Sequence, residues 1–112
     1  TRAFLPLVKP THGSVVFFTS EAVLDGSRSS GVSAYIAAKS AVVAIMRSVA
    51  DEGRASGIRA NAVAPSAIRT ATNEGSMGKD ARYIEREDVA AVVAFLCSPE
   101  SRALSGQVIR LR

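Results

Sequence analysis

Tyr35 and Lys39 are the two residues of this sequence whose types and spacing most directly suggest chemistry. They stand four residues apart in the segment YIAAK, at the start of an apolar, alanine-rich run. On a helix, residues four apart lie on the same face, one turn from each other. An ammonium group near a phenol favours the phenolate form, so Tyr35 could exchange a proton near neutral pH. An isolated tyrosine and lysine at this spacing are more often an ordinary helix-face aromatic and a solvated charge. The surrounding elements must decide between that structural interpretation and a proton-transfer pair.

Three apolar runs predict strands, and helical periodicities separate them. Residues 14–19 and 58–64 are β-rich runs typical of buried parallel strands, and residues 106–111 are a shorter one. Apolar residues at helical spacing predict helices over residues 34–55 and 86–96. This alternation favours a parallel sheet with right-handed crossovers. The sequence therefore predicts an α/β fold with about three strands and flanking helices.

The expected sheet brings two polar loops to one edge. Residues 21–33 form a Gly/Ser-rich loop that ends at Ser33, a candidate helix cap, and residues 66–78 form a second polar loop. Ligands of open parallel sheets bind beyond the carboxyl ends of the strands, where such loops lie. Tyr35 and Lys39 follow the first loop, so we expect them at this edge. Asn61, inside the second strand, is expected to be a structural hydrogen bonder.

Charge, hydropathy and cysteine content restrict the possible partners. The 14 Lys and Arg residues are scattered, and aromatic residues make up only 5% of the chain, so we expect no nucleic-acid partner. No uninterrupted apolar run approaches the roughly 18 residues that a membrane span needs, so we expect no membrane association. A single cysteine, Cys97, provides no metal cluster and no intrachain disulfide, which favours a cytoplasmic location. Cys97 follows an apolar helical run and is expected to be buried.

Five ordered elements resemble the short-chain dehydrogenase/reductase family. They are the strand ending in Ser20, the Tyr35–Lys39 motif, residues 57–65, residues 86–90 and residues 105–107, in the family's order and approximate spacing. The resemblance implies a partial Rossmann-like parallel sheet within three layers. It also implies an NAD- or NADP-dependent oxidoreductase that interconverts a carbonyl and an alcohol in a small-molecule substrate.

The same resemblance implies roles for individual residues. Tyr35 would be the general acid/base, Lys39 would support it and hold the nicotinamide ribose, and Ser20 would orient the substrate oxygen. Ser27, Ser29 and Ser30 are less favoured substitutes for Ser20. The expected cofactor-binding residues are Tyr35, Lys39, Pro65, Ser66, Ile68 and Thr70, and no metal site is expected. Ser66 stands where the family usually has glycine, and residues 71–83 form a short lid without an apolar helical face.

The resemblance covers only the carboxyl-terminal half of such an enzyme. We expect residues 1–112 to form a single domain that lacks the amino-terminal dinucleotide-binding half, because the sequence has no glycine-rich turn between a strand and a helix. Strand 14–19 would then be an open apolar edge. We therefore expect a homo-oligomer, or pairing with a missing amino-terminal half. The alternative to an oxidoreductase is a catalytically inactive, truncated remnant that acts as a self-associating interaction module.

Overall fold

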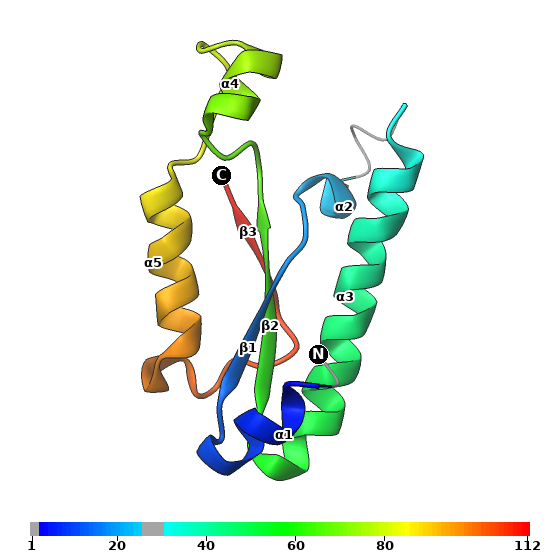
Figure 1. Cartoon of the computed structure of the whole chain (residues 1–112), viewed down its shortest axis with the longest axis vertical. Coiled ribbons are helices and arrows are strands. Elements are labelled where there is room, and N and C mark those ends of the chain that lie inside the picture. Colours follow the sequence, from blue (N-terminus) through cyan, green and yellow to red (C-terminus); the bar gives the residue numbers. More distant parts are fainter. Residues whose placement is uncertain (1–2, 26–30) are drawn as a thin grey trace.

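The chain folds around an open sheet of three parallel strands in the order β1-β2-β3. The computed structural model describes residues 3–25 and 31–112. The strands are β1 (Ser14–Phe18), β2 (Arg59–Pro65) and β3 (Val108–Leu111). Helix α3 (Ser33–Gly53) covers one face of the sheet and α5 (Arg86–Cys97) covers the other (Figure 1). The predicted α/β class and three-layer arrangement are confirmed.

Strand alternation divides the interior into two cores. Successive side chains of a strand point to opposite faces. Ala60 and Ala62 of β2 accordingly pack with Met46 of α3, whereas Val63 packs with Leu96 of α5. The alanines allow α3 to lie close to the central strand, which explains how an alanine-rich helix can be a core helix. The central strand is thus packed on both faces.

The two helical crossovers do not have the same hand. Both connections step in the same direction across the sheet, from β1 to β2 and from β2 to β3. Their helices, α3 and α5, lie on opposite faces (Figure 1). Two parallel crossovers that step the same way on opposite faces must have opposite hands. The expectation that both are right-handed is therefore wrong for one of them, although such connections are right-handed in most folds.

Two short helices occupy the segments expected to be loops. Helix α2 (Ala22–Asp25) follows β1, and α4 (Ala71–Met77) follows β2. Each has two turns or fewer, so it is too short to produce a clear hydrophobic period. The remaining short elements are α1 (Leu5–Val8), η1 (Lys9–Thr11), η2 (Arg54–Ser56) and η3 (Pro99–Ser101). Ser33 is the first residue of α3, and Val32 occupies the cap position without a side-chain hydrogen bond, so the predicted Ser33 cap is wrong.

Helix α3 tests the hydropathy expectation. Together with η2 it spans Ser33–Ser56, and its mean hydropathy reaches 1.2, so by length and composition it meets the criterion for a membrane span. The helix contains no uninterrupted apolar run of that length, because Lys39 and Arg47 lie within it, so the expectation stated for such runs is not contradicted. Met46, Val49 and Ala50 of this helix pack against the sheet. The core helix of a folded domain meets the same criterion, so this finding is weak evidence for a membrane.

Two further expectations about single residues had different outcomes. Asn61 is completely buried, donates to the Leu104 carbonyl at 2.9 Å, and accepts a hydrogen bond from the Gln107 amide at 3.1 Å. Its structural role is confirmed. Cys97 is exposed, so the expectation of a buried cysteine is wrong. Leu96, its neighbour in the last turn of α5, takes the core position instead.

Candidate active site

A cavity of about 630 Å³ lies beyond the carboxyl ends of the strands. Helices α2 and α4 and the start of α3 gather at this end of the molecule (Figure 1). Four expected site residues line the cavity, and they come from three segments far apart in the sequence: Ser20, Tyr35, Pro65 and Ser66. Further lining residues are Glu21, Ala22, Val32, Ala67, Asn73, Met77, Arg82 and Arg112. The fold therefore brings part of the predicted set together where parallel sheets place ligands, whereas Lys39, Ile68 and Thr70 do not line the cavity.

Tyr35 and Lys39 lie on one face of α3, as their spacing predicts. The Lys39 Nζ atom is 5.9 Å from the centroid of the Tyr35 ring. It also donates to the carbonyl of Phe18 at 3.2 Å, and the Thr19 hydroxyl donates to the Lys39 carbonyl at 2.9 Å. The lysine is thereby anchored to the end of β1. Tyr35 is 48% exposed, and its hydroxyl has no hydrogen bond to the described residues.

Ser20 shares the cavity with Tyr35 but also has a local structural contact. Its hydroxyl oxygen accepts a hydrogen bond from the Ala22 amide at 3.3 Å, at the start of α2. A hydroxyl group can donate its own proton while it accepts this bond, so the contact leaves Ser20 able to bind a substrate oxygen. The substitutes Ser27, Ser29 and Ser30 lie outside the described residues.

The loop after β2 places only part of the expected cofactor-binding set at the cavity. Pro65 and Ser66 line it. Ser66 does not have a positive φ, so this backbone conformation does not require the glycine that the family usually has. Ile68 pairs with Ile84 in an isolated bridge, and the Thr70 hydroxyl caps α4 by accepting from the Asn73 amide at 3.2 Å. The cofactor contacts of these residues stay predictions.

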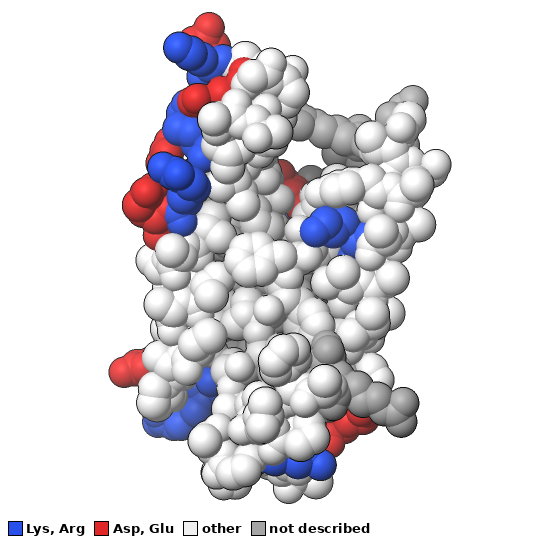
Figure 2. All heavy atoms as spheres, in the orientation of Figure 1, with Lys and Arg blue, Asp and Glu red and all other residues white. Residues whose placement is uncertain are grey.

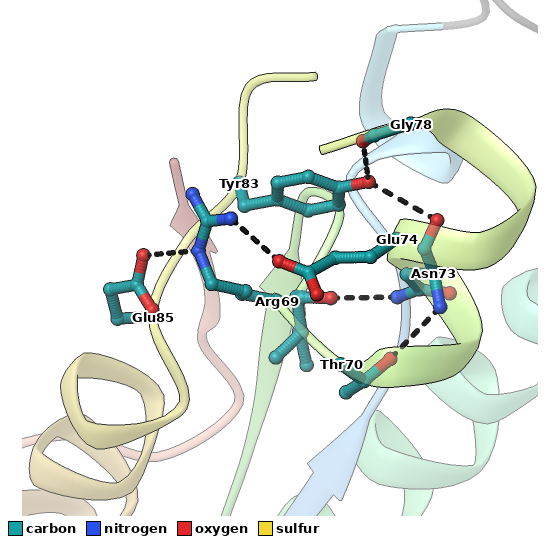
Figure 3. A network of polar contacts seen from close by, with 8 residues as sticks. Arg69, Thr70, Asn73, Glu74, Gly78, Tyr83 and Glu85 are labelled. Atoms are coloured by element: carbon teal, nitrogen blue, oxygen red, sulfur yellow. Dashed lines mark hydrogen bonds and ion pairs between the residues drawn. The ribbon is translucent and has the colours of Figure 1, made fainter. Parts of the chain in front are cut away.

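Arg69 ties the lid, residues 71–83, to the start of α5. Its guanidinium donates to Glu85 at 2.7 Å and to Glu74 at 2.8 Å, and it lies 4.8 Å from the centroid of the Tyr83 ring (Figure 3). The hydrogen bond to Glu85, followed by that to Glu74, raises the pKa of Arg69 above its ordinary value. The lid is therefore held by a polar network, which explains why it needs no apolar helical face.

The lid network continues from Tyr83 into α4. The Tyr83 hydroxyl lies 2.6 Å from the Gly78 carbonyl and 3.1 Å from that of Asn73 (Figure 3). The Asn73 side chain donates to the Ile68 carbonyl at 2.7 Å. Sequence reasoning missed this network because its members follow no periodic spacing. The residues of the lid that line the cavity, Asn73, Met77 and Arg82, were missed for the same reason.

Glu21 links the site to the last strand. Its carboxylate pairs with Arg112 and lies 3.8 Å from the Nε atom of Arg110. These contacts join residues about 90 positions apart in the sequence. No local pattern could have indicated them. The only acidic side chain among the described residues that line the cavity is therefore held in ion pairs.

A second cavity, of about 790 Å³, lies at the opposite edge of the sheet. It is lined by residues such as His12, Arg47 and Arg102, and none of the predicted site residues contributes to it. Larger volume is no reason to prefer it, because the proton-transfer candidates line the other cavity. Within the described part of the chain, no group of three or more His, Cys, Asp or Glu residues is placed to hold a metal ion.

Known proteins resemble this chain in both sequence and structure. The family model described as enoyl-(acyl carrier protein) reductase matches residues 1–111. A tropinone reductase homologue of Arabidopsis thaliana is 39% identical over 117 residues, which cover 93% of this chain and 44% of the relative. Human dehydrogenase/reductase SDR family member 4 is 33% identical over 122 residues, covering 97% of this chain and 43% of the relative. The chain thus spans less than half the length of these curated relatives.

Solved structures agree with the sequence comparisons. A short-chain type dehydrogenase/reductase from Mycobacterium ulcerans superposes with a TM-score of 0.85 and 32% identity, over 97% of this chain and 44% of that one. A structure described as an NAD(P)-dependent gluconate 5-dehydrogenase from Beutenbergia cavernae, with NADP bound at low occupancy, has a TM-score of 0.83 and 28% identity over 97% of this chain and 48% of that one. The chain belongs to the short-chain dehydrogenase/reductase family.

Proposed function

We propose that this chain supplies the proton-transfer part of an NAD(P)-dependent oxidoreductase that interconverts a carbonyl and an alcohol. The observation that carries the proposal is the position of Tyr35. Its exposed phenol lines a cavity together with Ser20, while Lys39 lies one turn further along α3 with its ammonium group near the ring. Carbonyl reduction needs a proton donor for the oxygen, a second hydroxyl can hold that oxygen, and a nearby cation favours the donor's deprotonated form.

The residues present fit the nicotinamide end of a dinucleotide. The Lys39 ammonium has three donors and uses one on the Phe18 carbonyl, so two are left for ribose hydroxyls. Pro65 and Ser66 border the same cavity, and Ile68 and Thr70 follow in the adjoining loop. Residues 3–25 and 31–112 contain no glycine-rich turn from a strand into a helix that would hold a pyrophosphate. We assign to this chain the nicotinamide contacts alone.

The chemistry assigned to the chain is a proton transfer at the substrate oxygen. A bound nicotinamide would supply or accept the hydride. During reduction, the Tyr35 hydroxyl gives its proton to the carbonyl oxygen as that oxygen becomes an alcohol. During oxidation, the Tyr35 phenolate takes the proton back. Ser20 donates a hydrogen bond to the same oxygen, and the Lys39 ammonium stabilises the negative charge that Tyr35 carries after it has given up its proton.

The relatives support the reaction class and leave the substrate open. Their names include a tropinone reductase homologue and a gluconate 5-dehydrogenase, which implies different substrates on one framework. Because the chain spans less than half of those proteins, we propose that it acts together with a separate nucleotide-binding segment. The single cysteine is consistent with a cytoplasmic location.

Nucleotide binding by the chain is the direct test. We would titrate it with NADH and NADPH, follow the nucleotide fluorescence, and then add a panel of ketones and follow nucleotide oxidation. Saturable binding with ketone-dependent oxidation is expected if the chain is competent, alone or after addition of a separately expressed amino-terminal half of a relative. Absence of binding and oxidation in both settings would contradict the proposal without affecting family membership.

A second candidate function is a self-associating interaction module without catalysis. The observation that favours it is the open edge of β1, which has no neighbouring strand on its outer side within the described residues. The module and the oxidoreductase differ in one measurement. Ketone-dependent nucleotide oxidation would exclude an inactive remnant, whereas self-association is compatible with both.

A further inference from the structure

The charges around the site cavity indicate what kind of substrate it can hold. Two arginines, Arg82 and Arg112, line it together with one glutamate, Glu21. Glu21 is paired with Arg112 and lies within ion-pair distance of Arg110. Its carboxylate is thereby compensated by protein cations. The cavity lining therefore has an excess of positive charge that Glu21 does not neutralise.

Arg82 is the cation that contributes this excess. It belongs to the lid, at the segment that leads from α4 to Tyr83, and it is exposed. Within the described part of the chain it makes no ion pair or side-chain hydrogen bond. Arg69, which precedes the lid, is in contrast held by two carboxylates, Glu74 and Glu85. The difference separates a structural arginine from one whose guanidinium is available to a ligand.

We propose that the substrate is an oxo acid whose carboxylate is bound by Arg82 while its carbonyl oxygen meets Ser20 and Tyr35. The proposal rests on the proposed oxidoreductase function. Ser20 and Tyr35 come from the β1 end and α3, whereas Arg82 comes from the lid beside α4, so the two ends of a substrate meet different elements (Figure 1). A cavity of about 630 Å³ lies within the usual range for small-molecule sites.

A carboxylate suits Arg82 better than a more highly charged group. A guanidinium offers a planar fork of donors that matches the two oxygens of a carboxylate. One available guanidinium compensates one negative charge, so a monoanion leaves no uncompensated charge at the cavity. Met77 and the Asn73 amide, from the same lid, provide apolar contact and a further hydrogen-bonding group for the chain of carbons between the two ends.

The experiment compares an oxo acid with its neutral amide. We would titrate the isotopically labelled chain with levulinate and with levulinamide and obtain dissociation constants from NMR shift changes. Levulinate is expected to bind about tenfold more tightly than the amide, as for a charge-assisted hydrogen bond. Arg82→Gln should abolish the preference. The matched control, Lys79→Gln, removes a positive charge from the same lid at a residue that does not line the cavity, and it should preserve the preference.

Equal affinities for acid and amide, undetectable binding of levulinate, or an unchanged preference in Arg82→Gln would each overturn the inference. An equal loss of the preference for levulinate in Arg82→Gln and Lys79→Gln would also overturn the inference, because it would indicate a general effect of net charge. Oxidation of NAD(P)H with neutral ketones separates this test from that of the proposed function. Oxidation of NAD(P)H with neutral ketones but no preference for acids would contradict the oxo-acid inference and leave the proposed function intact. A preference for acids without any turnover retains the anion site and removes the enzyme function.

Discussion

The two tyrosines of this chain occupy opposite kinds of environment. The Tyr83 hydroxyl is engaged by the carbonyls of Asn73 and Gly78, and its ring lies under the Arg69 guanidinium. Tyr35 lines the cavity, and its hydroxyl has no hydrogen bond to the described residues. A satisfied hydroxyl stabilises local structure, whereas an unsatisfied one beside a cation is available for proton exchange. The same substitution at each tyrosine can therefore test whether Tyr35 acts in catalysis and Tyr83 in stability.

Tyr35→Phe should remove catalysis and leave the fold intact. Loss of a general acid/base costs roughly a hundredfold or more in rate. Because no hydrogen bond to the described residues is lost, the free energy of unfolding should change by less than about 0.5 kcal/mol. The rate of ketone-dependent NAD(P)H oxidation, measured with the chain alone or with the added amino-terminal half, tests the loss of catalysis. Urea unfolding tests whether stability is unchanged.

Tyr83→Phe is the control for the same chemical change. It should cost about 1 kcal/mol of stability, because the hydrogen bond to the lid carbonyls is lost. The rate should fall far less than in Tyr35→Phe. A Tyr35→Phe protein with the original rate would refute the acid/base role of Tyr35.

Residue spacing reveals some of the site and conceals the rest. Tyr35 and Lys39 are visible in the sequence because one helical turn fixes their relation, and Ser20 is visible because it ends a strand. Arg69 meets Glu85 across 16 residues, and Glu21 meets Arg112 across 91. Such contacts depend on how strands and lid come together in three dimensions. The charge of the cavity, which decides the proposed substrate class, could not be predicted from the sequence.

At the scale of elements, Arg59 connects β2 to the end of α5. Its half-buried guanidinium donates to the carbonyls of Leu96, Ser98, Ser101 and Leu104, at distances of 3.0 to 3.3 Å. The last carbonyls of a helix lack partners within it, and a cation there is favourable. Arg59 therefore fixes the turn that leads from α5 toward β3.

Arg59→Met should destabilise the protein by about 2–4 kcal/mol, because several partly buried carbonyls each lose a charge-assisted hydrogen bond at once, although each keeps another donor. The control is Arg54→Met. The Arg54 side chain is 82% exposed and forms a surface ion pair with Asp51, so its loss should cost less than about 0.5 kcal/mol. Urea unfolding of both variants measures the difference. Similar losses of unfolding free energy in both variants would show that Arg59 does not stabilise the turn between α5 and β3 more than a surface arginine does.

The long helices and the apolar strands could be predicted, whereas the short helices α2 and α4 could not. Helices α3 and α5 repeat their apolar spacing over several turns, and strands β1 and β2 are continuous apolar runs, so each pattern is visible even where single residues depart from it. Helix α4 is specified mainly by contacts such as the Thr70 cap and the Tyr83 hydroxyl, which appear only once the lid has folded. The hand of each crossover is likewise a property of the packed sheet. Local sequence therefore anticipates the layers better than the lid.

At the scale of the whole molecule, one edge of the sheet is incomplete. Within the described residues β1 pairs only with β2, and Phe18 at its end is 46% exposed. Thr19 donates inward to the Val63 carbonyl at 2.9 Å, and strand amides alternate in direction, so the Val16 and Phe18 amides face outward. Figure 2 shows that the charges on one face gather over α4 and the start of α5 and at the opposite end of the molecule, with few over the middle of the sheet and α3. An open strand edge with little charge nearby favours association with another chain.

We therefore expect the chain to self-associate at micromolar concentration through β1. Phe18→Lys adds a charge to the open edge and removes apolar surface, so it should weaken association about tenfold. The matched control is Phe95→Lys on α5, where the side chain is 45% exposed and the same charge and apolar area change away from the edge. Light scattering and sedimentation across a concentration series compare the three proteins.

A monodisperse monomer of the original chain would refute self-association, and equal weakening by both substitutions would show that the β1 edge is not the specific contact. Association that survives only in Phe95→Lys would identify the edge at which a second strand, from a copy or from a nucleotide-binding segment, completes the sheet.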